Sequence, residues 1–214
     1  MTTNTEIALQ MVKANEQTLK DIEQVLVAFN ESPEDPSICL MLLEKESERW
    51  QVIIDSIPGL IGLNGFAPFG AKREGDGKSP TGLFRIGLLF TYLDSVNTQM
   101  PYLQSTNEDK WIDDPESKDY NRLVRGETDA ASYEPLLLRS NAYKYCLVIE
   151  YNTNPVIKRH GSAIFLHLHG RREEPTAGCI AINEKDMEKI LTHLDPVKNP
   201  AILMGNKYIL LTGI

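Results

Sequence analysis

Hydrophobic positions near the start of the chain recur at three- and four-residue spacing, which is the pattern of one buried face of an α-helix. This pattern runs from residue 6 to residue 29, at Val12, Leu19, Ile22, Leu26 and Phe29. The segment ESPEDPS ends it, because neither of its prolines can continue a helix. We therefore expect an N-terminal amphipathic helix and linker over residues 1–36, packed on the rest of the protein. A dimerisation or anchoring helix is the alternative.

After residue 36 the pattern changes to short apolar runs bounded by glycine, proline, asparagine and aspartate, which is typical of β-strands. The runs are ICLMLLE, WQVIID, GLFRIGLLF, YCLVIEY, SAIFLHLH, PAILM and YILLT. They are too closely spaced for regular βαβ units, so residues 37–214 are predicted to form a mainly β domain, a sandwich or barrel-like body with peripheral helices. The segment from Leu93 to Ala142 is long, polar and poor in strand pattern, and such loops are often functional.

One further helix is predicted near the C-terminus. Asn183 is a suitable N-cap, and Asp186 stands three residues later. The apolar positions that follow, with helical spacing, are Met187, Ile190, Leu191 and Leu194. Pro196 marks the end of this helix.

Length and charge exclude several classes of protein. The 214 residues are enough for one core with an appendage. The 22 basic and 30 acidic residues give a net charge of −8, which argues against non-specific binding to nucleic acid or to an anionic membrane surface. No apolar run is long enough for a membrane-spanning helix, so we expect no membrane insertion. The first twenty residues do not have the pattern of a signal peptide, which leaves cytoplasmic and exported locations both open.

The three cysteines are an odd, small number, which does not indicate a disulfide framework. Cys39 and Cys146 lie in apolar runs and are predicted to be small buried residues. Cys179 lies in the stretch FLHLHGRREEPTAGCIAI, where a short loop separates it from His167 and His169. The two histidines should share one face of a strand, and the loop can return the thiol to the end of that strand.

A thiol near a histidine is a candidate nucleophile, because the imidazole supplies a base and a positive charge that favours the thiolate. Backbone amides around Gly178 and Cys179 are candidate oxyanion donors, and Thr176 can bond within the turn or to a substrate. Two alternatives remain open for this stretch. A zinc site could use the two histidines with Cys179 or His160, and Cys179 could be a plain buried residue.

Three ordered blocks of the chain resemble the L,D-transpeptidase catalytic domain, the YkuD family. HLHGRREEPTAGCIAI is similar to the family's histidine followed by Ser/Thr-x-Gly-Cys, and NGFAPFGAKREGDGKSPTGLFRIG is similar to its Gly-Asp-Gly-x-Thr-Pro-x-Gly-x-Phe element. The third block, WIDDPESKDYNRLVR with the later YKYCLVIEYNTNPVIKRHGSAIF, resembles a compact bacterial branch of the family. The chain departs from many members at Ala177, where they have histidine, and at Ala181.

The resemblance implies a cysteine acyltransferase that acts on peptidoglycan stem peptides, with Cys179 as the acyl-accepting nucleophile and no cofactor or metal. It leaves open whether His167 or His169 is the base, and we prefer His167 by its distance from the cysteine. Hydrolysis of the same bond and a non-catalytic peptidoglycan-binding module are the alternatives. A substrate of this kind implies the cell envelope or periplasm, with the cytoplasm as the alternative. The sequence does not determine the oligomeric state.

Two further features bear on the predicted cleft. Tyr120, Asn121 and Arg122 are candidates for its wall, since an arginine can bind a substrate carboxylate through two hydrogen bonds. A solvated loop is the alternative for Arg122. The segment EGDGKSPTG has the Gly-Lys-Ser of a phosphate-binding loop, but Lys72 stands where that loop needs glycine, so we predict a turn.

Overall fold

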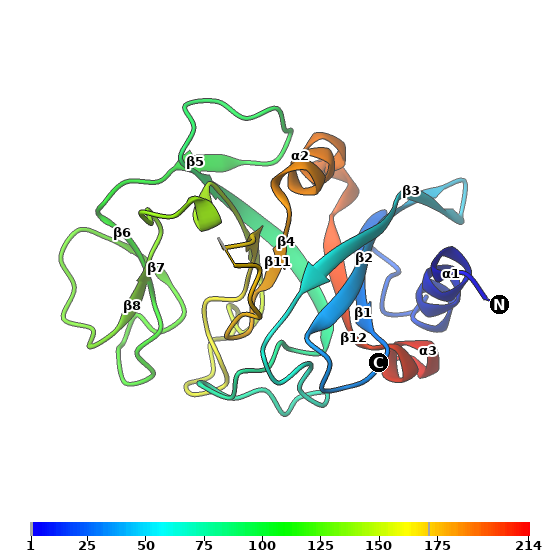
Figure 1. Ribbon diagram of the computed structural model, residues 1–214, viewed down its shortest axis with the longest axis horizontal. Helices are drawn as coiled ribbons and strands as arrows, with labels where there is room; N and C mark the ends of the chain where they lie inside the picture. The colour runs from blue at the N-terminus through cyan, green and yellow to red at the C-terminus, as the bar shows by residue number, and fades with distance from the viewer. Residues whose placement is uncertain (1, 171) are drawn as a thin grey trace.

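The computed structural model describes residues 2–170 and 172–214, and its centre is one nine-stranded sheet (Figure 1). The strands of this sheet are β1 (Gln24–Asn30), β2 (Ser37–Glu46), β3 (Arg49–Leu60), β4 (Gly82–Thr91), β5 (Tyr102–Gln104), β9 (Tyr145–Ile149), β10 (Phe165–Leu168), β11 (Ile180–Ile182) and β12 (Ala201–Asn206). Their order is β12-β1-β2-β3-β11-β10-β9-β4-β5, and β12 also pairs with β4. The sheet therefore closes on itself, which confirms the predicted mainly β, barrel-like body with peripheral helices.

The remaining elements surround this closed sheet. They are the helices α1 (Asn4–Ala14), α2 (Glu184–His193) and α3 (Lys207–Thr212), the 3-10 turns η1 (Asn141–Tyr143) and η2 (Pro196–Lys198), and the strands β6 (Asp109–Ile112), β7 (Leu123–Arg125) and β8 (Tyr133–Pro135). Helices α1 and α3 lie together at one end of the molecule, next to both chain termini, and the small sheet of β6 to β8 lies at the opposite end (Figure 1).

The predicted N-terminal helix is wrong beyond its first half. Helix α1 ends at Ala14, because the side chain of Asn15 takes over the capping of its last turn, donating to Met11 O at 2.8 Å. Residues 24–30 form strand β1, which pairs with β2 and in parallel with β12. The spacing of apolar residues fits a helix equally well, but the run QVLVAF contains two valines and a phenylalanine, which favour strands, and it is buried along its whole length.

Strand β1 is apolar on both faces because each face is covered. Leu26 and Ala28 belong to the cluster inside the closed sheet, together with residues of β10, β11 and α2. Val25, Val27 and Phe29 alternate with them and pack against α1 and α3. A strand covered on both sides shows no polar alternation, and this explains why its sequence resembled a helix.

The predicted strand YILLT is also wrong. Strand β12 ends at Asn206, whose side-chain oxygen accepts from Tyr208 N at 3.1 Å and so begins helix α3. The chain ends are joined by Asn15, whose side chain donates to Leu210 O at 2.8 Å and accepts from Ile214 N at 2.9 Å. The other predicted helix, α2, is confirmed with Asn183 as its N-cap.

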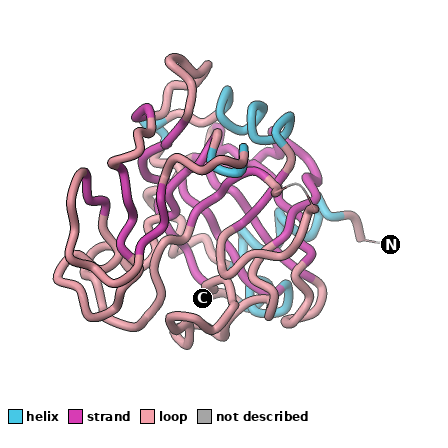
Figure 2. The backbone as a smooth tube through the Cα atoms, turned by 60° about the vertical axis from the view of Figure 1, so that its left-hand side comes forward, coloured by secondary structure: helices cyan, strands magenta, loops and turns pink. Residues whose placement is uncertain are grey.

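The long polar segment from residue 93 to residue 142 contains four short strands, although its sequence lacks a strand pattern. Three of them, β6, β7 and β8, form the separate small sheet, visible beside the main sheet in Figure 2. The ion pair between Asp109 and Arg125, 2.7 Å apart, ties β6 to β7. The indole of Trp111 packs edge-on against Phe165, with ring centroids 5.4 Å apart, and so fixes the small sheet against β10.

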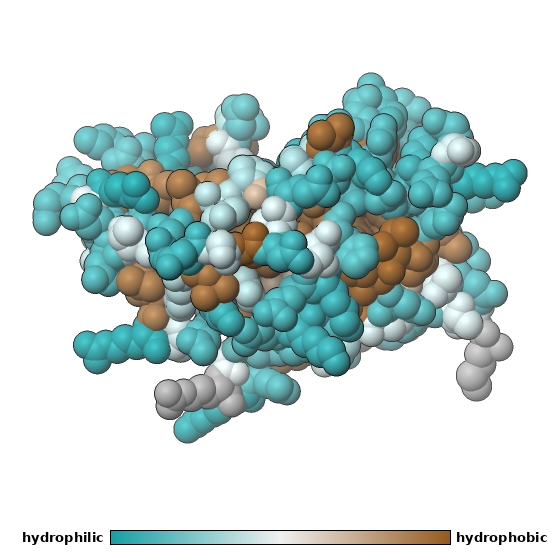
Figure 3. All heavy atoms as spheres, turned by 90° about the horizontal axis from the view of Figure 1, so that it is seen from above, coloured by the Kyte–Doolittle hydropathy of each residue, from teal (hydrophilic) through white to brown (hydrophobic). Residues whose placement is uncertain are grey.

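Hydrophilic side chains cover most of the face that Figure 3 shows, with apolar side chains gathered in a few places. Within residues 2–170 and 172–214, no helix has the length and apolar character needed to cross a membrane.

Helix α1 belongs to a packed core, so removing a side chain from its inner face should destabilise the whole protein. Met11 has 0% exposure. We expect Met11→Ala to lower the free energy of unfolding by about 2–5 kcal/mol, because it leaves a cavity against β1 and α3. Urea denaturation measures this change, and the exposed neighbour Gln10→Ala is the matched control. A Met11→Ala protein as stable as the control would show that α1 is a detachable appendage.

Candidate active site

A tight turn places Cys179 directly before β11. The turn is attached to the segment after β3, since Thr176 N donates to Ile61 O and Leu63 N donates to Thr176 O, both at 2.9 Å. The Thr176 hydroxyl then closes the turn: it accepts from Gly178 N at 3.0 Å and donates to Cys179 O at 2.7 Å. The predicted role of Thr176 within the turn therefore matches its contacts.

The Cys179 sulfur lies against the backbone that leads into β10. Its thiol donates to Ala163 O at 3.1 Å, and it accepts from Phe165 N at 3.4 Å. A carbonyl oxygen can only accept, so this arrangement holds the protonated thiol. Burial raises the pKa of the Cys179 thiol to about 12; the Phe165 amide lowers it, Glu134 raises it and Lys72 lowers it. The residue as a whole is half-buried, and its exposed part faces a cavity.

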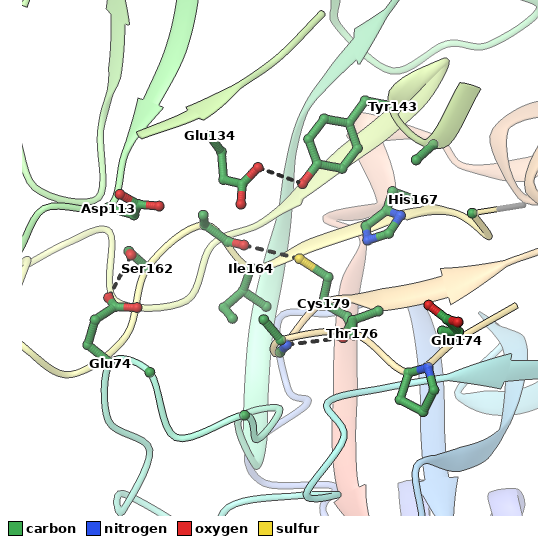
Figure 4. Close-up of a pocket in the computed structure, with 18 of the residues that line it drawn as sticks. Glu74, Asp113, Glu134, Tyr143, Ser162, Ile164, His167, Glu174, Thr176 and Cys179 are labelled. Carbon is green, nitrogen blue, oxygen red and sulfur yellow. Dashed lines mark hydrogen bonds between the residues drawn. The ribbon is translucent and has the colours of Figure 1, made fainter. Parts of the chain in front are cut away.

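His167 lies on β10, in register with Ala181 of β11, and borders the same cavity as Cys179. Figure 4 shows the imidazole and the sulfur on the same side of this cavity. The imidazole Nδ1 is 2.8 Å from Leu168 O. Because that oxygen only accepts, Nδ1 carries the hydrogen and Nε2 keeps a free lone pair. The ring of Tyr143 packs against the imidazole, with centroids 5.2 Å apart.

The surroundings of Cys179 and His167 favour the neutral form of each group, whereas the sequence suggested a thiolate. Burial lowers the pKa of His167 to about 4; the Leu168 carbonyl raises this pKa and His169 lowers it. The imidazole is therefore a free base near neutral pH, and the Cys179 thiol keeps its proton.

The cavity beside Cys179 and His167 has a volume of about 690 Å³, which is in the range of ligand-binding sites. Its lining residues are Lys72, Glu74, Gly75, Gly77, Asp113, Glu134, Ala142, Tyr143, Ser162, Ala163, Ile164, His167, Gly170, Arg172, Glu174, Pro175, Thr176, Ala177, Gly178 and Cys179. They come from the Gly-Asp-Gly block, the region of the small sheet, η1, β10 with the segment before it, and the cysteine turn, so all three blocks noted in the sequence meet at this cavity (Figure 4).

His169 stands apart from the pair. It follows the end of β10, its backbone amide donates to Ile182 O at 2.8 Å, and its side chain is half-buried. Burial lowers the pKa of His169. His167 is one of the described residues that line the cavity, and His169 is not.

Tyr120 and Asn121, expected in the cleft wall, are buried beneath it. The Tyr120 hydroxyl donates to Glu74 and accepts from Gly161 N at 3.0 Å, and burial raises the pKa of this tyrosine. The Asn121 side-chain oxygen accepts from Ala163 N at 3.0 Å. Asn121 thus fixes the residue whose carbonyl holds the Cys179 thiol. Arg122 is exposed, and it does not border the cavity as the structure describes it.

Three residues at the cavity were not expected from the sequence: Lys72, Glu134 and Tyr143. Lys72 is buried, and its ammonium group donates to Asp76 Oδ1 at 2.7 Å. Burial and then the nearby Asp113 raise the pKa of Glu134, while the Tyr143 hydroxyl, 3.4 Å from its carboxylate, lowers it. Lys72 could have been found from its place in the Gly-Asp-Gly block. The other two lie in the strand-poor segment, where no spacing points to a site.

No cluster of three or more histidine, cysteine, aspartate or glutamate side chains suited to a metal ion is found in residues 2–170 and 172–214.

Acidification should remove part of the stability that the neutral His167 contributes. Its pKa is about 4 in the folded protein, against 6.5 when unperturbed, so between these values the unfolded chain binds the extra proton. The stability is therefore present above about pH 6.5 and lost as the pH falls toward 4, by about 3 kcal/mol for a shift of this size. Urea denaturation at both pH values should show a smaller loss in His167→Gln than in the wild type. Equal losses in the two proteins would contradict the depressed pKa.

Comparison with known proteins identifies the family of this chain. The family model described as YkuD, the L,D-transpeptidase catalytic domain, matches residues 48–203. No curated protein matches the chain. Among solved structures, the helical cell shape determining protein Pgp2 from Campylobacter jejuni is similar, with a TM-score of 0.48 and 13% sequence identity. That alignment covers 94% of this chain and 56% of the Pgp2 chain. Because the family model matches well over half of this 214-residue chain, the protein belongs to the YkuD family of L,D-transpeptidase catalytic domains.

Proposed function

We propose that this protein is a cysteine acyltransferase of the L,D-transpeptidase type, which acts on peptidoglycan stem peptides through a thioester on Cys179. The observation that carries the proposal is the placement of the Cys179 thiol and a neutral His167 on one cavity of about 690 Å³. A cavity of this volume is in the range of pockets that bury most of a drug-sized ligand. The donor would be a stem tetrapeptide, and the bond broken would join its L-centre to its D-centre.

In the first step the Cys179 sulfur attacks the carbonyl carbon of this bond. The thiol proton passes to Nε2 of His167, the nitrogen left free by the Leu168 carbonyl. The thiol leaves its hydrogen bond to Ala163 O as the new carbon–sulfur bond forms. The neutral pair suits this step, because charge develops only as the substrate reacts.

The carbonyl oxygen becomes an oxyanion and needs a hydrogen-bond donor. The amide of Gly178 is already bound to the Thr176 hydroxyl, which leaves the amide of Cys179 as the donor we assign to the oxyanion. When the intermediate collapses, the carbon–nitrogen bond breaks and the departing amine takes the proton back from His167. The product of this half-reaction is a thioester on Cys179 and a free D-amino acid.

The acyl group then passes to a second nucleophile. An amine acceptor gives a cross-link or an attached protein, and water gives hydrolysis, which would make the protein an L,D-carboxypeptidase or amidase. Both outcomes use the same first step. Since the proposed substrate is a cell-wall peptide, we also propose that the protein works in the cell envelope.

Covalent capture tests the proposal. Incubation with a carbapenem, or with a stem tetrapeptide, should add one acyl group to the wild-type protein, measured by intact mass. Cys179→Ala should form no adduct, because the acyl-accepting sulfur is gone. Cys39→Ala is the matched control, since Cys39 is also a half-buried free thiol, and it should form the adduct like the wild type.

The same assay separates the two histidines. We expect His167→Asn to lower the rate of acylation by about a hundredfold or more, as the loss of a general base does, while His169→Asn acylates at nearly the wild-type rate. An adduct that persists in Cys179→Ala would overturn the assignment of the nucleophile. A wild-type protein with neither adduct nor turnover would point to a non-catalytic peptidoglycan-binding module.

A further inference from the structure

A buried serine lies directly behind the nucleophile's own peptide bond. Ser79 belongs to the segment GDGKSP, and its side chain has 0% exposure. Its hydroxyl donates to Gly178 O at 2.6 Å and accepts from Gly62 N at 3.0 Å. Because it has no exposed surface, it cannot touch a substrate, and any effect on the reaction has to pass through Gly178.

The backbone around Ser79 is held by bonds of its own. Ser79 N donates to Gly65 O at 2.9 Å, and Ala67 N donates to Ser79 O at 2.8 Å. Gly178 packs closely against the loop segment that contains Ser79, since a Cβ at position 178 would lie 3.0 Å from Lys78 O. These backbone bonds fix the position of the serine hydroxyl. Because they do not involve the side chain, the backbone of residue 79 should stay in place when the hydroxyl is removed.

The bond from Ser79 sets the orientation of one peptide plane. In a trans peptide the carbonyl oxygen and the next amide hydrogen point in opposite directions. Ser79 holds the Gly178 carbonyl on its own side, so the Cys179 N–H is directed away from Ser79. Among the described residues, no protein acceptor is found for this N–H, whereas the preceding amide is bound by Thr176.

We propose that Ser79 is a positioning residue, which aims the Cys179 N–H at the oxyanion by holding the Gly178 carbonyl. The inference rests on the proposed acyl transfer. Without the Ser79 hydroxyl, the plane of the 178–179 peptide can rotate, and the N–H then meets the oxyanion at a poorer angle. Hydrogen bonds weaken steeply with angle, so the loss appears in the transition state rather than in substrate binding.

Two reactions of the same sulfur separate this role from a purely structural one. Acylation by a carbapenem passes through an oxyanion, but alkylation by iodoacetamide does not. In a Cys39→Ala background we expect Ser79→Ala to slow acylation by about tenfold or more, since deleting an oxyanion donor outright costs about 10²–10³ in rate. Alkylation of Cys179 should change by less than about twofold, because the sulfur keeps its own contacts.

The control variants are Ser79→Thr and Thr81→Val. Ser79→Thr restores a hydroxyl and should recover the rate of acylation. Thr81 is a buried hydroxyl of the same loop that donates to Ala67 O at 2.6 Å, away from Gly178, so Thr81→Val should destabilise the loop without a selective loss of acylation. If Ser79→Ala does not fold, Ser79→Cys can replace it, because a thiol is a weaker donor of similar size. Ser79→Cys should show a smaller selective loss in the rate of acylation.

The inference would be overturned if Ser79→Ala slowed acylation and alkylation equally, or if Ser79→Ala were acylated at the wild-type rate. It would also be overturned if Thr81→Val lost acylation as selectively as Ser79→Ala does. If the wild-type protein is alkylated at Cys179 but never acylated, the proposed function is wrong, and the inference about Ser79 is wrong with it. The two failures are therefore distinguishable in one set of measurements.

Discussion

The site depends on the hydrogen bonds that hold the Cys179 thiol against the backbone entering β10. Ala163 O accepts from the thiol and Phe165 N donates to the sulfur, so the side chain has one orientation and keeps its proton. Asn121 fixes Ala163 from below, which explains a buried asparagine in a segment that is otherwise loop. An unbonded thiol at this place would turn freely, and its distance from the imidazole would vary.

The closed sheet brings together groups that lie far apart in the chain. Strand β10 pairs in parallel with β11, so the cysteine turn enters beside His167 with its register set by the ladder. The Gly-Asp-Gly block crosses under the turn and supports Gly178 through Ser79. The small sheet of β6 to β8 supplies Glu134, and η1 supplies the Tyr143 ring that packs on the imidazole. Four separate segments thus converge on one sulfur, and the hydrophobic clusters on either side keep them rigid.

The sequence predicted the strand-rich body and helix α2, because each has a strong local signal, and it directed attention to Cys179 and His167, which border one cavity. It failed at β1 and α3 for a physical reason: a strand covered on both faces loses its alternation, and a short C-terminal helix depends on one asparagine cap. Tyr120, Asn121 and Arg122 were grouped by sequence position, but their side chains have different surroundings, with two buried and one exposed. Lys72, Glu134 and Tyr143 reach the cavity only through tertiary packing, which spacing in the chain does not encode.

In the proposed mechanism Cys179 rests as a neutral thiol beside a neutral imidazole. The ultraviolet absorbance of the thiolate tests this directly, as a difference between the wild type and Cys179→Ser across the pH range. With a Cys179 pKa of about 12, the difference spectrum should show no thiolate band below about pH 9. A thiolate band that develops between about pH 5 and 7 would show a thiolate–imidazolium pair and rule out the neutral resting state.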